Sequence, residues 1–180
     1  VRKMEQTTPW RWPLASVGII ANPAAGKDIR RLVAHGRYVT NQEKVNVLRR
    51  VLSGLGAAGV ERVLMMPDVG LLGRAAADGV STTMAIEILQ MTVFNADRDS
   101  TTAAELMVRN GVGCLIVLGG DGTNRAVAKT SGDVPLVPIS TGTNNVFPSV
   151  VEGTVAGLAA GVVARGLVDI ASVTSLTSVL

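Results

Sequence analysis

The chain has 180 residues and a formal net charge of +3, with 47% apolar residues but only 3% aromatic ones. This length allows one sizeable domain and, at most, a fragment of a second. The basic residues form no long run with interleaved aromatic residues, which argues against a dedicated nucleic-acid surface. A core of Val, Leu, Ile, Ala and Met is typical of buried parallel strands flanked by helices.

The chain carries no sequence signal for secretion, membrane insertion or disulfide bonding. Its single cysteine, Cys114, allows no internal disulfide and reads as a core residue of an apolar strand, and no Cys/His cluster has the spacing of a zinc site. No apolar stretch approaches the roughly 20 residues that span a bilayer. Residues 1–15 lack the apolar core of a secretory signal and are expected to be a tail. We therefore expect a cytoplasmic protein without a stable membrane anchor.

Short apolar runs alternate with helix-like segments from Ser16 onward. Strands are expected at residues 17–21, 60–66, 83–91, 114–118 and 134–139. The run at 114–118 is the most apolar and is expected to be central, whereas Pro135 and Pro138 place the last strand near an edge.

Helix signals fall between these strands. Thr40 and Glu43 have the spacing of a capping box, and the helix that follows should end at Gly59. Further helices are expected near residues 71–77, after a cap at Asp99 or Ser100, and at residues 151–165.

Alternation of strand and helix, repeated about five times, predicts a Rossmann-like α/β domain in three layers, with an open, mainly parallel sheet. Right-handed crossovers then bring the carboxyl ends of the strands to one edge. We assign this domain to residues 16–168, followed by a tail or the start of another domain at 169–180. Residues 27–39 interrupt the alternation as a basic excursion.

Three loops rich in Gly or Asn directly follow strands: "NPAAGK" from Asn22, "GGDGTN" from Gly119 and "STGTNN" from Ser140. In a parallel sheet all three would lie at the edge where ligands of such folds bind. The three loops together indicate a ligand site, whereas each loop alone is a weak signal.

The second of these loops indicates a polyphosphate site. Glycines let backbone N–H groups approach phosphate oxygens, and a helix N-terminus favours anions. A carboxylate at Asp121 then makes sense with Mg²⁺ beside the phosphates, or as a base that accepts a proton from an attacking hydroxyl. The alternative is that Asp121 only caps the helix and the glycines only form a turn.

The other two loops are less specific. "NPAAGKD" fails the P-loop pattern, so Lys27 either meets a phosphate or is a solvated lysine after a turn. Asn144 and Asn145 have donors and acceptors suited to a base edge or ribose hydroxyls, but Asn pairs are also common in turns.

With these motifs in order along residues 17–165, the chain resembles the superfamily of NAD kinases and diacylglycerol or sphingosine kinases. "NPAAGKDIRR" and "GTNNVFP" are most similar to the ATP-NAD kinase-like proteins named for acetoin catabolism. The resemblance implies a kinase that transfers a phosphoryl group from ATP, with Mg²⁺, to the ribose 2′-hydroxyl of NAD, as in NADP biosynthesis. Asp121 would be the motif aspartate, catalytic or metal-organising. By the same resemblance, Gly119, Gly120, Gly122 and Thr123 would surround the phosphates, and Asn144 and Asn145 would approach the nucleoside. Taken with the three loops, the candidate nucleotide-binding residues are Asn22, Gly26, Lys27, Gly119, Gly120, Gly122, Thr123, Thr141, Gly142, Thr143, Asn144 and Asn145.

Some family features differ here. The chain has no Asn-Glu dipeptide of the NAD kinases, and it has Gly-Thr-Asn-Asn-Val where lipid kinases carry Gly-Thr-Gly-Asn-Asp. Members of the superfamily also have a second, strand-rich domain, which has no counterpart in these 180 residues. A lipid kinase domain and a non-catalytic nucleotide-binding module therefore stay open as alternatives. We also expect self-association through exposed apolar surface.

Overall fold

A computed structural model describes residues 15–26, 39–141 and 145–169 of the chain. The strands are β1 (Ser16–Ala21), β2 (Arg62–Met65), β3 (Ala85–Ile88), β4 (Cys114–Gly119) and β5 (Leu136–Ser140). The helices are α2 (Asn41–Ala57), α3 (Leu72–Ala77), α4 (Asp97–Arg109), α5 (Asp121–Ala128) and α6 (Gly153–Ala164). The expected tails and most of the expected basic excursion lie outside the described residues.

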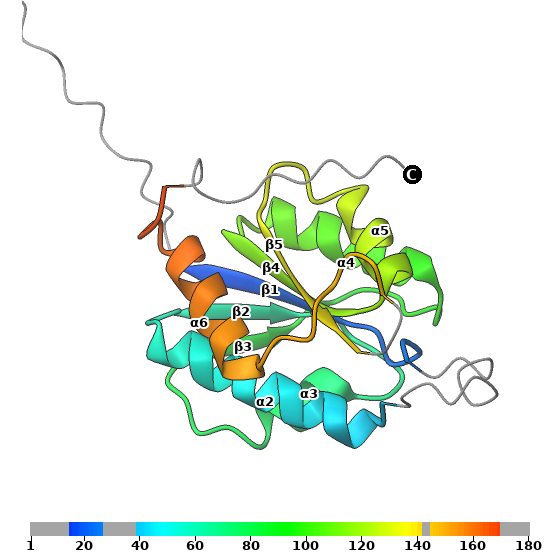
Figure 1. Cartoon of the computed structure of the whole chain (residues 1–180), viewed down its shortest axis with the longest axis horizontal. Coiled ribbons are helices and arrows are strands. Elements are labelled where there is room, and N and C mark those ends of the chain that lie inside the picture. Colours follow the sequence, from blue (N-terminus) through cyan, green and yellow to red (C-terminus); the bar gives the residue numbers. More distant parts are fainter. Residues whose placement is uncertain (1–14, 27–38, 142–144, 170–180) are drawn as a thin grey trace, which may run out of the picture.

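The five strands form one parallel sheet in the order β3-β2-β1-β4-β5. Helices α2, α3 and α6 cover one face, and α4 and α5 cover the other (Figure 1). This arrangement confirms the three-layer α/β fold. Strand order reverses between β1 and β4, which makes their carboxyl ends a topological switch point, where open α/β sheets bind ligands.

Strand extents differ most from the expectation in β2, β3 and β5, and β5 covers Leu136–Ser140 rather than 134–139, so that Pro135 precedes it. β2 and β3 are shorter than predicted, with four residues each, because only these residues pair in register with their neighbours. β4 is fully buried between β1 and β5, as its apolar run predicts, but the middle strand is β1. β5 is an edge strand, where the missing N–H of Pro138 is tolerated.

The N-caps of α2 and α4 can be compared with the expected ones. The capping box of α2 is present, since Glu43 N–H donates to Thr40 Oγ1 at 3.1 Å and Thr40 N–H donates to Glu43 at 2.8 Å. The expectation that Asp99 or Ser100 caps α4 is wrong, because the N-cap is Ala96. Asp99 instead lies inside the first turn, where its carboxylate accepts the N–H groups of Phe94 and Ala96.

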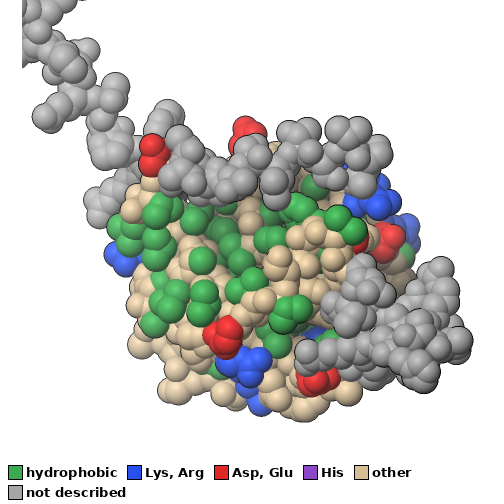
Figure 2. Space-filling model, viewed as in Figure 1, with side chains coloured by type: hydrophobic (Ala, Val, Ile, Leu, Met, Phe, Trp, Pro, Cys, Tyr) green, Lys and Arg blue, Asp and Glu red, His purple; other side chains and the backbone are tan. Residues whose placement is uncertain are grey.

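The core lies on both faces of the sheet, and helix α6 approaches α2 very closely. A Cβ on Gly157 would lie 2.2 Å from the carbonyl oxygen of Val51, so the two helices meet backbone to backbone. Cys114 is fully buried, as expected of a core residue, and burial raises the pKa of its thiol to about 12. Hydrophobic side chains also gather on the surface over α6 (Figure 2), where Val155 and Leu158 are exposed.

Candidate functional site

The three sequence-predicted loops meet at the carboxyl edge of the sheet. We call them the β1 loop (residues 22–26), the β4 loop (residues 119–124) and the β5 loop (residues 140–147, of which 142–144 lie outside the described residues). The β1 loop directly follows β1, whereas the β4 and β5 loops begin with the last residue of their strands, and the β4 loop includes the first residues of α5. Because β1, β4 and β5 are neighbours in the sheet, the loops are brought side by side.

Hydrogen bonds connect the β4 loop to both of the others. Asn22 Nδ2 donates to Thr123 Oγ1 at 3.1 Å, which links residues 101 positions apart in the chain. The N–H of Thr141 donates to the carbonyl oxygen of Gly119 at 3.4 Å. Asn22 also folds its own loop, because its Oδ1 accepts the N–H of Ala24 at 2.8 Å.

Glycines allow the loops to come this close. Gly26 has a φ of +77°, and a Cβ there would lie 2.4 Å from the carbonyl oxygen of Thr141. A Cβ on Gly119 would lie 2.6 Å from Thr123, and one on Gly120 would lie 3.0 Å from Asn145 Oδ1. These three glycines therefore have a packing role that is independent of any ligand.

Gly122 differs from them because a Cβ at this position would have no neighbour within 4 Å among the described residues. It is the second residue of α5, at the end of the helix where backbone N–H groups lack intrahelical partners. The helix dipole favours anions at this end. The backbone around Gly122 is therefore open to a ligand.

Asp121 connects the β4 loop to the β5 loop. Its carboxylate accepts the N–H of Phe147 at 2.9 Å and the N–H of Val146 at 3.0 Å. The alternative that Asp121 caps its helix is wrong, because it is the first residue of α5 and the N-cap is Gly120, which has no side chain. The carboxylate instead holds a segment 25 residues further along the chain.

Lys44 was not among the predicted site residues. Its side chain is completely buried, and its ammonium donates to the carbonyl oxygens of Pro23 at 2.7 Å and Asn22 at 3.1 Å. It thus supports the β1 loop from the α2 side. A signal existed in the sequence, since Lys44 lies on the same helix face as Leu48, Val51 and Leu55, where a charged residue is unusual.

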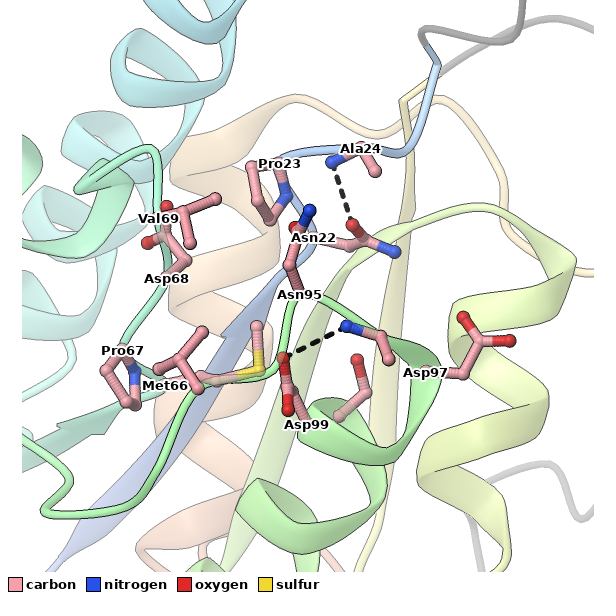
Figure 3. A pocket seen from close by; sticks show the side chains of 13 residues that line it. Asn22, Pro23, Ala24, Met66, Pro67, Asp68, Val69, Asn95, Asp97 and Asp99 are labelled. Atoms are coloured by element: carbon pink, nitrogen blue, oxygen red, sulfur yellow. Dashed lines mark hydrogen bonds between the residues drawn. The ribbon is translucent and has the colours of Figure 1, made fainter.

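A small cavity of about 60 Å³ lies beside the β1 loop, between the ends of β1 and β2 and the start of α4 (Figure 3). Three carboxylates line it: Asp68, Asp97 and Asp99. Asp68 accepts the N–H of Leu72 at 3.0 Å, and burial raises the pKa of its carboxyl group. This volume holds a few water molecules and is too small for a nucleoside.

The structure brings together nine of the predicted site residues: Asn22, Gly26, Gly119, Gly120, Asp121, Gly122, Thr123, Thr141 and Asn145. Asn145 is engaged within its own loop, because its Nδ2 donates to Ser140 Oγ at 2.8 Å. Lys27, Gly142, Thr143 and Asn144 lie outside the described residues. Within the described ranges, no helix combines the length and apolar character that a membrane span requires.

Comparison with known proteins agrees with this geometry. Residues 17–167 match the family model described as the ATP-NAD kinase N-terminal domain. The chain is 46% identical over 157 residues to "Acetoin catabolism protein X" of Cupriavidus necator, which covers 83% of this chain and 44% of that protein. The chain thus spans less than half the length of this curated relative. No solved structure matches the chain. On the match over residues 17–167, the chain belongs to the ATP-NAD kinase family.

Proposed function

We propose that this domain binds ATP with Mg²⁺ and presents the terminal phosphate to a hydroxyl group of a small molecule, with the ribose 2′-hydroxyl of NAD as the favoured acceptor. The observation that carries the proposal is the joining of three loops at the switch point between β1 and β4 through Asn22, Thr123 and Asp121. Family membership supports a nucleotide as the ligand of this edge.

The phosphates are assigned to the start of α5. Gly122 leaves the backbone open there, and the first N–H groups of the helix suit phosphate oxygens. Asn22, Gly26, Gly119, Gly120 and Thr123 shape this cradle through the contacts described above.

Asp121 has the chemistry to hold Mg²⁺ against the phosphates. A carboxylate has about four acceptor positions, and two backbone N–H groups leave capacity for a cation. In the part of the chain that the structure describes, no group of three His, Cys, Asp or Glu residues is arranged as a metal cage. This donor set fits Mg²⁺, which is commonly bound by one or two carboxylates together with substrate phosphates. When bound, the ion neutralises charge that develops on the transferred phosphoryl group.

Asp121 is also the proposed catalytic residue, in either of two roles. It accepts the proton of the acceptor hydroxyl, or it positions the phosphoryl group through the metal. Its bonds to Val146 and Phe147 hold the carboxylate in one orientation, and positioning accounts for most of the catalysis of phosphoryl transfer.

A second candidate function is nucleotide binding without transfer. The same two bonds favour it, because they give Asp121 a purely structural task in joining the loops. The chain also spans only 44% of the length of its relative, so more than half of that protein has no counterpart among the matched residues.

Calorimetry with ATP and Mg²⁺, then with NAD, tests the proposal, together with an assay for NADP formation. We expect binding by the native chain and an altered affinity in Asp121→Asn. If Asp121 is the general base, turnover should fall by roughly 10²- to 10⁴-fold. Asp133→Asn, at an exposed turn, is the matched control and should behave as the native chain does.

Three outcomes separate the candidates. Full turnover in a folded Asp121→Asn variant would exclude a catalytic role for this carboxylate. Nucleotide binding without turnover would favour the binding module. Absence of binding to the folded chain would contradict both candidate functions.

A further inference from the structure

A large cavity lies on the α2 and α6 side of the sheet, next to the β4 and β5 loops. Its volume is about 520 Å³. Apolar side chains from four different segments form much of its wall: Val47, Leu118, Ile139 and Val151. Small-molecule sites typically measure roughly 300 to 1,000 Å³ and have mainly apolar walls. The cavity thus has the size and lining of a ligand site, whereas the 60 Å³ cavity beside the β1 loop does not.

The charged side chains around this cavity already have partners. Arg50 pairs with Glu152 at 3.0 Å, and Lys44 donates to Pro23. The carboxylate of Glu43 accepts the N–H of Thr40, the N-cap residue of its own helix. A charged ligand would have to displace one of these interactions, so the lining favours an uncharged one.

One polar group in the lining lacks a partner. Thr141 is only 3% exposed, and its Oγ1 has no hydrogen-bond partner among the described residues. Buried hydroxyl groups are nearly always hydrogen-bonded, so an isolated one next to a cavity indicates a ligand or water that completes it. Thr141 also contacts the β4 loop, through its N–H bond to Gly119.

We infer that this cavity receives the nucleoside part of the nucleotide, with the Thr141 hydroxyl hydrogen-bonded to the base or the ribose. The inference rests on the proposed function, because the phosphates of the same ligand would then lie at the start of α5. Leu118 lines the cavity and directly precedes Gly119 of the proposed phosphate site, so consecutive residues of the chain belong to the two sites. The ring system would pack against the apolar wall, and the charged pairs would stay intact.

Adenosine is the probe that tests this inference, since it carries no phosphate and does not depend on the anion cradle. We expect saturable binding of adenosine to the full chain in calorimetry. Thr141→Val should weaken it by about three- to tenfold, the effect of one lost hydrogen bond. The same variant should keep or raise the melting temperature, because it removes an unpaired buried hydroxyl. If Thr141 has only a structural role, Thr141→Val should lower the melting temperature and leave the affinity for adenosine unchanged.

A blocking variant provides the second arm. Val150 lines the cavity from a position that is 79% exposed, so Val150→Trp should fold normally and weaken adenosine binding by more than about tenfold. Val155→Trp is the matched control, because Val155 is exposed on α6 but does not line the cavity.

The outcomes distinguish this inference from the proposed function. Absence of adenosine binding would overturn the inference even if ATP still binds. Adenosine affinities of Thr141→Val and Val150→Trp equal to that of the native chain would overturn it as well. Adenosine binding that both variants weaken, without any phosphoryl transfer, would uphold the inference and contradict the kinase proposal.

Discussion

The ammonium nitrogen of Lys44 lies 2.7 Å from the carbonyl oxygen of Pro23, and the whole lysine side chain is buried. A buried ammonium is costly unless it is hydrogen-bonded, and here two loop carbonyl groups meet it. The pair therefore connects helix α2 to the loop that we assign to the nucleotide.

Replacing Lys44 by Met should destabilise the fold and disturb the β1 loop. The carbonyl group of Pro23 would lose its partner, at a cost of about 1–3 kcal/mol. Urea denaturation measures the loss, and ATP calorimetry measures the effect on the loop. Lys129→Met, at an exposed position, should change stability by less than about 0.5 kcal/mol. Equal free energies of unfolding of the two variants would show that the buried hydrogen bonds of Lys44 contribute nothing to stability.

Two glycine substitutions should separate folding from ligand binding. Gly157→Ala places a Cβ 2.2 Å from Val51 O and should cost about 1–3 kcal/mol, because α2 and α6 must move apart. Gly122→Ala meets no atom of the described residues within 4 Å and should keep or slightly raise stability, since Ala is the better helix former. It should nevertheless weaken polyphosphate binding. Thermal unfolding and calorimetry with ATP test both. Unchanged ATP affinity in Gly122→Ala would show that Gly122 does not contact the phosphates.

Asp68 should make stability depend on pH. Burial raises the pKa of its carboxyl group, so the folded protein binds this proton more tightly than the unfolded chain does. The resulting stabilisation is present below the ordinary carboxyl pKa and is lost as the pH rises through the raised value. Asp68→Asn should therefore gain stability relative to the native chain between pH 4 and pH 7. Urea denaturation of the native chain and of Asp68→Asn at both pH values checks this. A difference in unfolding free energy between the two proteins that does not change with pH would contradict it.

Cys114 should be inert in the folded chain. Its side chain is buried in β4, and a thiol pKa of about 12 leaves almost no thiolate near neutral pH. Labelling with a thiol reagent should proceed only after denaturation, when the pKa returns toward its ordinary value. Rapid labelling of the native protein would mean that β4 opens locally.

Local patterns predicted much of the fold and the composition of the candidate site. Alternating apolar runs and the Thr40–Glu43 capping box were enough for β1, β4 and α2. The N-cap of α4 was not predictable in this way, because the helix begins after Ala96, whose side chain cannot accept a hydrogen bond, although Asp99 and Ser100 nearby are favoured cap types. The Asp99 carboxylate instead bonds to N–H groups of the preceding loop, whose path no local pattern specifies.

The sequence alone determined that the chain is a parallel α/β domain with three Gly- or Asn-rich loops at one edge. It could do so because strand–helix alternation and right-handed crossovers leave few other topologies. Only the tertiary structure decided the partners: Asn22 with Thr123, Asp121 with Val146 and Phe147, and Lys44 beneath the β1 loop. These contacts join residues 21 to 101 positions apart, so they follow from strand order and packing, which no local pattern encodes.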